Sequence, residues 1–295
     1  MIADRKNLVI IRAGEKTLHR AWLENATNRN WDIIVSWYGS TEYEPVADER
    51  VMLIKGGKWD GLYKTITALP DLLDQYDYFW LPDDDIATDC DTINRVFDLM
   101  RQHGLNVGQP SLSWNSYFTH FVTLNVPGLH LRYTNFVEVM VPCLNAETLR
   151  QVLLLFAETM TGFGLDWVWT RLDENPERKA AIFDCITVHH TRPLGVYLYN
   201  IALKNGQNPN QELTLLLNKF HLGEPNKLHN TVYGALGKQF YINKYFLMFI
   251  LIIKSLKYNI NKPDPDGKTF TLKYIRRNIK NMIRKTNVTS VKNFL

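Results

Sequence analysis

The chain has 295 residues, of which 45% are hydrophobic, and its formal net charge is +4. This length and apolar content allow a large buried core, so the composition excludes a disordered protein and favours one sizeable domain with or without an appendage. The three cysteines lie far apart, without the paired spacing of a zinc site or a disulfide framework, and no apolar signal-peptide segment opens the sequence. We therefore expect a cytoplasmic location.

Charge is unevenly distributed along the chain. Residues 254–295 carry eleven Lys and Arg residues and two Asp residues, a net charge of +9, which leaves −5 for residues 1–253. A basic tail on an acidic body is typical of a protein whose tail has an anionic partner.

The first half of the chain alternates short apolar runs with helical stretches. Near-continuous apolar strands separated by helices are typical of βαβ units, in which helices cover both faces of a mainly parallel sheet. We therefore predict a Rossmann-like α/β fold, in which ligands bind beyond the carboxyl ends of the strands. The predicted strands are Leu8–Arg12, Trp31–Tyr38, Val51–Lys55 and Tyr76–Leu81, and helices are predicted at Lys16–Asn25 and from the glycines at 56–57 to Pro70.

Three acidic residues, Asp83, Asp84 and Asp85, directly follow the fourth predicted strand. Carboxylates this close repel one another unless a cation neutralises them. On an extended turn the first and third side chains point the same way, so Asp83 and Asp85 can share Mg²⁺ or Mn²⁺ while Asp84 points elsewhere. The alternative is that Asp85 or Asp89 caps the following helix, which Gly104 ends.

Residues 108–145 are rich in Trp, Tyr, His and Asn. Aromatic faces stack on the apolar patches of a sugar ring and amides bind its hydroxyl groups, so this segment suits a sugar-binding surface. The valines at 137, 139 and 141 also predict a strand here, and part of the segment then belongs to the core. The candidates for acceptor or sugar binding are Trp114, Tyr117, His120 and Asn135.

The segment Thr159–Leu172 has two glycines, Gly162 and Gly164, shortly before Asp166 at the start of a predicted amphipathic helix. Glycine permits a tight turn, and the helix dipole favours an acid at this place. Asp166 therefore either caps the helix or takes a proton from an incoming hydroxyl group.

The last motif is a pair of histidines. The alternation of Ile186 and Val188 predicts a strand in which His190 faces their side and His189 faces the other. Either imidazole can complete a metal site begun by the carboxylates, and Arg192 can bind phosphate oxygens. The alternatives are a hydrogen-bonded core histidine and a surface arginine.

In this order, the Asp triplet after a strand, the GFGLD segment and the VHHTRP segment resemble metal-dependent glycosyltransferases of the GT-A fold, and more narrowly the DUF707 family. The resemblance spans residues 6–200. It implies that Asp83 and Asp85 hold Mn²⁺ or Mg²⁺ against the diphosphate of a nucleotide sugar, with Asp83 also near the ribose. It further implies that His190 is the third metal ligand, with His189 as the alternative.

The resemblance also implies roles for the remaining motifs. Asp166 corresponds to the general base of inverting enzymes, although GFGLD has one acid where those enzymes often have two; without this base a retaining route is open. Arg192 would lie near the diphosphate, and Arg12 and Gly14, at the end of the first strand, near the nucleoside.

The glycine turn after the third predicted strand offers a second place for the nucleotide. Gly57 and Lys58, together with Lys55 and Gly56, suit the close approach of a phosphate or uracil edge. The alternative is a plain turn with solvated lysines.

The chain changes character after residue 223, so we predict a catalytic domain at 1–223 and a helical, basic region at 224–295. The apolar run Tyr245–Ile253 has nine residues, far short of the roughly 20 that span a bilayer. Its flanking lysines fit an interfacial helix on the inner membrane face, where a lipid-linked acceptor is found. The alternative is a helix packed on the catalytic domain or on a partner protein. No nucleic-acid-binding motif accompanies the basic residues.

The sequence therefore predicts a metal-dependent glycosyltransferase that moves a hexose from a nucleotide sugar, a UDP-sugar by the family resemblance, to a polysaccharide or glycolipid. Two alternatives are a metal-dependent phosphohydrolase or nuclease, and a non-catalytic carbohydrate-binding protein with the same fold.

Overall fold

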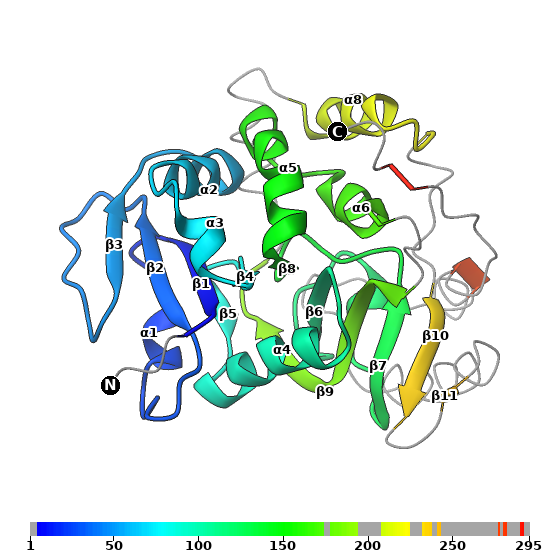
Figure 1. Ribbon diagram of the computed structural model, residues 1–295, viewed down its shortest axis with the longest axis horizontal. Helices are drawn as coiled ribbons and strands as arrows, with labels where there is room; N and C mark the ends of the chain where they lie inside the picture. Colours follow the sequence, from blue (N-terminus) through cyan, green and yellow to red (C-terminus); the bar gives the residue numbers. More distant parts are fainter. Residues whose placement is uncertain are drawn as a thin grey trace.

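The computed structural model describes residues 5–173, 178–193, 208–224, 232–237, 241–242, 277, 280–281 and 290–291. They form three layers, with a central sheet between two layers of helices (Figure 1). The predicted α/β class is confirmed.

The sheet is mainly parallel, as predicted. Among the described residues, the strands that point in one direction are β1 (Asn7–Ala13), β2 (Asp32–Trp37), β3 (Arg50–Leu53), β4 (Tyr78–Trp80), β6 (Val107–Leu112), β9 (Ala180–His190) and β10 (Val232–Gly237). The strands that point the opposite way are β7 (Leu129–Thr134), β8 (Cys143–Asn145) and β11 (Tyr241–Ile242). Their order across the sheet is β11-β10-β7-β9-β6-β8-β4-β1-β2-β3, and the short β5 (Ile86–Ala87) pairs with β9 off this path.

Strand β1 shows why the sheet needs helices on both faces. All seven of its residues are buried. Successive side chains of a strand point to opposite faces, so Val9 and Ile11 join one core cluster while Leu8 and Ile10 join the other. Such a strand is stable only inside a three-layer fold.

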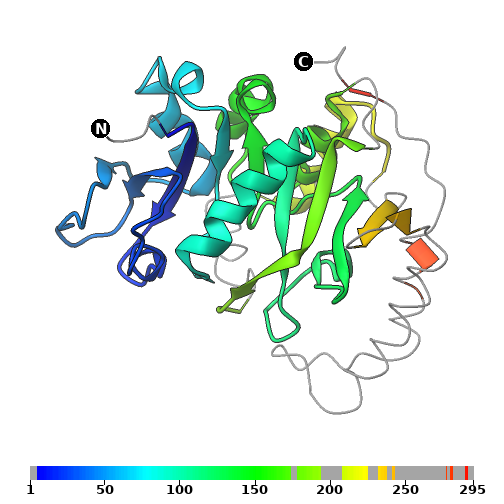
Figure 2. The same ribbon diagram turned by 60° about the horizontal axis from the view of Figure 1, so that its bottom comes forward.

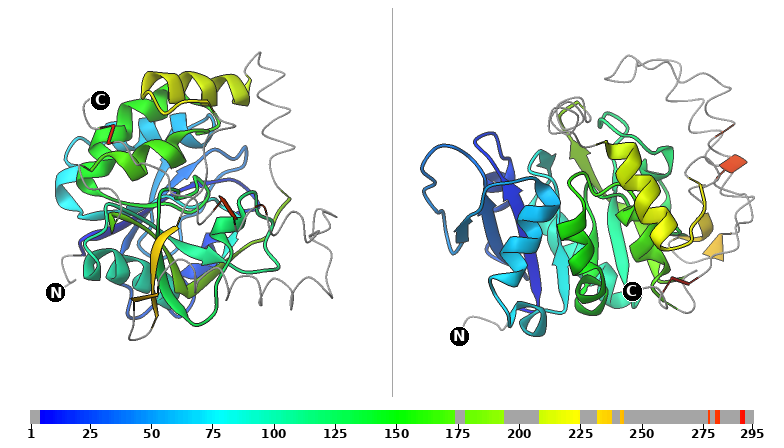
Figure 3. Two further views of the ribbon diagram at one scale, coloured as in Figure 1. Left: turned by 90° about the vertical axis from the view of Figure 1, so that its right-hand side faces the viewer. Right: turned by 90° about the horizontal axis from the view of Figure 1, so that it is seen from above.

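The helices divide between the two faces. The face of Val9 packs against α1 (His19–Trp22) and α4 (Cys90–Gln102), and α4 crosses β6 and β9 (Figure 2). The face of Leu8 packs against α2 (Lys58–Thr67), α3 (Leu72–Gln75), α5 (Ala146–Glu158), α6 (Leu165–Val168) and α8 (Pro209–Lys219), and Figure 3 shows α2, α5 and α8 together on that side. No helix among the described residues is long and apolar enough to cross a membrane.

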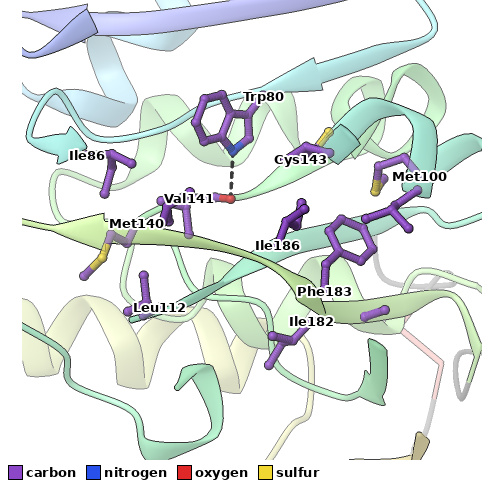
Figure 4. Packing of buried hydrophobic residues seen from close by; sticks show 14 of the residues in the cluster. Trp80, Ile86, Met100, Leu112, Met140, Val141, Cys143, Ile182, Phe183 and Ile186 are labelled. Atoms are coloured by element: carbon purple, nitrogen blue, oxygen red, sulfur yellow. Dashed lines mark hydrogen bonds between the residues drawn. The ribbon is translucent and has the colours of Figure 1, made fainter. Parts of the chain in front are cut away.

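Packing on the α4 side places the end of β4. The indole of Trp80 donates to the carbonyl oxygen of Val141 at 3.1 Å, within a cluster that also contains Met100 of α4 and Phe183 of β9 (Figure 4). Trp80 is fully buried, so the chain leaves the sheet at a fixed position three residues before Asp83.

One of the two helix-cap alternatives is confirmed. The Asp89 carboxylate accepts the backbone N–H of Thr92 at 2.7 Å and caps α4, and the chain turns at Gly104 with φ +55° just after that helix. The helix cap is therefore Asp89, and Asp85 is available for another role.

Of three local predictions, one is confirmed, one is met only in part and one is wrong. The helix expected after Gly164 is present as α6 and the 3-10 turn Trp169–Arg171 that continues it, whereas the helix expected at Lys16–Asn25 is only the single turn α1. The strand expected around residues 137–141 is absent from the described structure, because side chains from elsewhere bind the carbonyl oxygens of this segment.

The sheet does not stop at the predicted domain boundary. Strands β10 and β11 lie beyond residue 223, and β10 pairs with β7. The division of the chain near residue 223 stays a prediction, because most of the residues beyond it lie outside the described structure. The apolar run 245–253 and most of the basic tail lie outside the described residues.

Candidate functional site

The pairing of β5 with β9 brings the acidic triplet to the late histidines. Ile86 lies opposite His190 in this antiparallel pair, and Thr191 donates its backbone N–H and its hydroxyl to the carbonyl oxygen of Asp85, at 3.2 and 2.8 Å. Asp85 Oδ2 consequently lies 3.2 Å from His190 Nε2. Asp83 is held by its own N–H, which donates to the Met140 carbonyl oxygen at 2.9 Å.

Asp83, Asp85 and His190 have the geometry of a metal site. Each offers one ligand atom, and these atoms all lie within 4.8 Å of one another. His190 Nδ1 lies 2.9 Å from the Tyr117 carbonyl oxygen and donates to it, which leaves Nε2 for a metal. Asp85 Oδ1 is buried and has no hydrogen-bond partner among the described residues. Two carboxylates and an imidazole suit Mn²⁺ or Mg²⁺, so these residues fit the predicted cation.

The predicted parity of the two histidines is also confirmed. His190 is buried and His189 is partly exposed on the other side of β9. Burial acts to lower the pKa of His190, but the hydrogen bond to Asp85 and the charges of Asp85 and Asp83 raise it overall. When no metal is bound, a proton on His190 supplies positive charge beside the two carboxylates. A bound divalent cation would supply that charge instead.

Asp84 points away from this cluster, as predicted, and joins three segments. Its Oδ2 accepts the backbone N–H of Gly14 and the hydroxyl of Tyr38, both at 3.1 Å, and its Oδ1 accepts Nη1 of Arg192 at 2.9 Å. Arg192 also donates to the Lys16 carbonyl oxygen. Gly14 and Arg192 are thus brought together at Asp84, next in sequence to the candidate metal-binding residues Asp83 and Asp85, and their contact with a nucleotide stays a prediction.

Arg12 is buried, and its guanidinium orders the loop before α2. Its Nε donates to the Gly57 carbonyl oxygen at 3.0 Å and Nη2 to the Gly56 carbonyl oxygen at 2.9 Å. Nη1 donates to the Ser36 hydroxyl at 2.8 Å and the Ile54 carbonyl oxygen at 2.9 Å. These donors are directed at protein oxygens, so Arg12 holds the loop before α2, and its contact with a nucleotide stays a prediction.

Lys58 connects that loop to the acidic triplet. Gly57 is the N-cap of α2 and Lys58 its first residue. The ammonium group lies 2.5 Å from Asp83 Oδ1 and donates to the Val139 carbonyl oxygen at 2.7 Å. The alternative of a solvated lysine is therefore wrong for Lys58, because its side chain is mostly buried.

Asp166 lies in the first turn of α6, after a loop in which two glycines have positive φ. Gly162 has φ +76° and Gly164 has φ +103°. Asp166 is 7% exposed, and Oδ1 is buried with no hydrogen-bond partner among the described residues. Burial raises the pKa of Asp166 to about 7, although backbone N–H groups of Gly164 and Trp167 act to lower it. A carboxylate that titrates near neutral pH and has a free oxygen suits a general base.

A residue that sequence reasoning missed holds this loop. Glu212 of α8 accepts three hydrogen bonds on Oε2, from Thr159 Oγ1 at 2.9 Å, Thr161 N at 3.1 Å and Thr161 Oγ1 at 2.7 Å. No sequence signal connects these positions, because Glu212 stands some fifty residues away.

Of the four predicted sugar-binding residues, Tyr117 contacts the site directly, and His120 is connected to the neighbour of Asp166 through two aromatic contacts. The backbone of Tyr117 exchanges hydrogen bonds with His190. The ring of His120 lies 4.4 Å from that of Phe136, which in turn lies 5.1 Å from Trp167, next to Asp166.

The other two have structural contacts. Trp114 packs against the core and donates its indole N–H to the Asn125 carbonyl oxygen at 2.9 Å. Asn135 is 1% exposed, and its carbonyl oxygen accepts the hydroxyl of Thr170 at 2.8 Å. Sugar contact by any of the four stays a prediction.

Solved structures match this chain at low similarity. Residues 1–349 of S. aureus TarS in complex with UDP-GlcNAc match at a TM-score of 0.44 and 11% identity, covering 75% of this chain and 74% of that one. The mannosyltransferase PcManGT from Pyrobaculum calidifontis, in complex with GDP-Man and Mn²⁺, matches at a TM-score of 0.48 and 13% identity, covering 72% and 64%.

A comparison with curated proteins finds no match. A family model does match, under the description "Protein of unknown function (DUF707)", over residues 31–214. The match covers more than half of the chain and includes the acidic triplet, Asp166, both histidines and Glu212. The chain belongs to the DUF707 family.

Proposed function

We propose that this protein is a metal-dependent glycosyltransferase that transfers a hexose from a nucleotide sugar to a hydroxyl group of a glycan or glycolipid. The observation that carries the proposal is a pair of features whose charged groups both act on the buried Glu138. One is the Asp83, Asp85 and His190 cluster, whose ligand atoms lie within 4.8 Å of one another. The other is the buried Asp166, which has a free carboxylate oxygen and a pKa raised to about 7.

The acidic cluster supports a diphosphate substrate. Asp83, Asp85 and His190 would hold the cation, and a bound Mn²⁺ or Mg²⁺ supplies positive charge for the diphosphate as the sugar leaves it. Asp84 ties Arg192 to the adjoining segment, so the guanidinium lies near this charge and can support the same leaving group. The nucleoside would lie toward Gly14 and the Gly57–Lys58 turn.

Asp166 supports an inverting transfer. In its ionised form it takes the proton of the acceptor hydroxyl group, whose oxygen forms a bond to the anomeric carbon. The bond between that carbon and the diphosphate oxygen breaks, and its electron pair leaves with the nucleoside diphosphate. The reaction consumes the nucleotide sugar and the acceptor and needs no further reactant.

The proposal extends to the acceptor and its location. The basic C-terminal segment, with a net charge of +9 over residues 254–295, would attract an anionic membrane surface. A lipid-linked acceptor at the inner face of a membrane fits such a tail.

Titration calorimetry tests the proposal. The purified protein is titrated with UDP, UDP-GlcNAc, UDP-Glc, UDP-Gal, GDP and GDP-Man, each with and without Mn²⁺, and release of the nucleotide is then followed with the nucleotide sugar that binds. Binding that requires Mn²⁺, followed by release of a nucleoside diphosphate, supports a glycosyltransferase. Absence of metal-dependent binding to any nucleotide sugar, including UDP-Glc and UDP-Gal, would refute it.

A further inference from the structure

One buried acid of this site has no role in the mechanism above. Glu138 is 4% exposed, and its Oε2 is buried without a hydrogen-bond partner among the described residues. A buried carboxyl oxygen without a hydrogen bond lowers the stability of the folded protein. We therefore expect this oxygen to have a function, such as binding a ligand.

The segment that carries Glu138 crosses from the Asp166 loop to the metal ligands. Before Glu138, the Val137 carbonyl oxygen accepts the indole N–H of Trp169 at 3.0 Å, in the turn that follows α6. After it, the Val139 carbonyl oxygen accepts Lys58 Nζ at 2.7 Å. Glu138 therefore stands between the two halves of the site.

The backbone of this position is fixed independently of the carboxyl group. Glu138 N donates to Gln109 Oε1 at 2.6 Å, on strand β6. Two residues later, the Met140 carbonyl oxygen accepts the N–H of Asp83 at 2.9 Å. Because these contacts use main-chain groups of the segment, the Glu138 side chain can change without removing them.

The charged groups that surround the carboxyl group are those of the site. Burial raises the pKa of Glu138 to about 8, the charges of Asp166 and Asp83 raise it too, and those of His190 and Lys58 lower it. At neutral pH the carboxyl group therefore keeps its proton and can both donate and accept a hydrogen bond, as a sugar hydroxyl group does.

We propose that Glu138 is a substrate-binding residue whose carboxyl group hydrogen-bonds a hydroxyl group of the transferred sugar, between the Asp83–Asp85–His190 cluster and Asp166. The inference rests on the proposed function, because it names the residue that recognises the sugar in the same site. Glu138 would bind the sugar, and the groups around Asp84 and Lys58 would bind the nucleotide.

The test compares a nucleotide sugar with its nucleotide. The Kd of UDP and of UDP-GlcNAc, or of GDP and GDP-Man if the protein binds guanosine, is measured with Mn²⁺ for wild type, Glu138→Leu and Glu138→Gln. Glu138→Leu should weaken binding of the nucleotide sugar about tenfold, as expected for one hydrogen bond to a buried group, and leave nucleotide binding unchanged. Glu138→Gln keeps a donor and an acceptor and should retain most of the sugar contact.

Controls separate this role from a structural one. Glu147→Leu removes an exposed acid of α5 and should change neither Kd. Without ligand, Glu138→Leu should be at least as stable as wild type, because it removes a buried polar oxygen that has no hydrogen bond. If leucine does not fit at this position, Glu138→Ala is tested in place of Glu138→Leu.

The outcomes are distinguishable. If wild type binds no nucleotide with Mn²⁺, the proposed function fails and this inference fails with it. If wild type binds and the ratio of the two Kd values is the same in Glu138→Leu or Glu138→Ala as in wild type, only the role of Glu138 is overturned. A ratio that shifts in Glu138→Leu and is restored in Glu138→Gln supports the assignment.

Discussion

Gly162 has two independent reasons to be glycine, and a substitution can separate them. Its φ of +76° lies in the left-handed region, and a methyl group at its Cα would lie 2.6 Å from Cδ1 of the Trp59 indole. Trp59 is 1% exposed and packs against Phe156 and Trp169, so it has little freedom to move away.

Gly162→Ala should therefore be strongly destabilising. The left-handed conformation costs a residue with a side chain about 1–2 kcal/mol, and overpacking a filled core costs about 1–3 kcal/mol. We expect the free energy of unfolding to fall by about 2–5 kcal/mol, the sum of these two effects. Urea denaturation followed by tryptophan fluorescence measures the change.

Gly128→Ala is the matched control. Gly128 has φ +94°, and nothing lies within 4 Å of the position of an added methyl group. The control should lose only the conformational part, about 1–2 kcal/mol. If Gly162→Ala is no more destabilising than Gly128→Ala, the close approach of the Asp166 loop to Trp59 is wrong, and so is the placement of Asp166.

Three further predictions concern charged groups. His190→Ala should abolish Mn²⁺ binding in calorimetry while His189→Ala preserves it, and the reverse result would exchange their roles. Asp166 has a pKa raised from 3.8 to about 7, so the folded state binds more protons than the unfolded state between these values and wild type loses stability as pH rises through that window. Asp166→Asn should lose turnover but not donor binding. In metal-free buffer its free energy of unfolding should exceed that of wild type by about 4 kcal/mol at pH 8 and equal it near pH 3. A difference that stays constant across this pH range would contradict the assignment. Arg132 pairs with Asp184 at 2.7 Å with both side chains fully buried, so Arg132→Met should cost about 3–5 kcal/mol in urea denaturation; a loss below about 1 kcal/mol would show that the pair contributes little.

The local features of the site were predictable from sequence because their causes are local. An apolar run fixes β4, and the chain leaves the sheet at its carboxyl end, where Asp83 and Asp85 follow. The alternation along β9 fixes which histidine is buried. The glycines at 162 and 164 indicate the tight turn before Asp166.

Other roles depend on contacts that no local pattern encodes. Arg12 at the end of a strand suggests a nucleotide ligand, but its donors bind the carbonyl oxygens of Ile54, Gly56 and Gly57, which are distant in sequence. The valines around Glu138 alternate as a strand does, yet Lys58 and Trp169 bind the carbonyl oxygens that a neighbouring strand would need. The side-chain partners of this segment decide its conformation, and they become visible only in the folded chain.

In the proposed site, Asp83, Asp85 and His190 hold a divalent cation that faces a nucleoside diphosphate. The most direct measurement is the anomalous difference map of crystals grown with Mn²⁺ and UDP, or GDP if the protein binds guanosine. We expect a manganese peak within coordination distance of all three side chains, roughly 2.0–2.3 Å, with phosphate oxygens completing the ligand set. A map in which the nucleotide is bound and the manganese lies elsewhere, with Asp85 still hydrogen-bonded to His190, would contradict it.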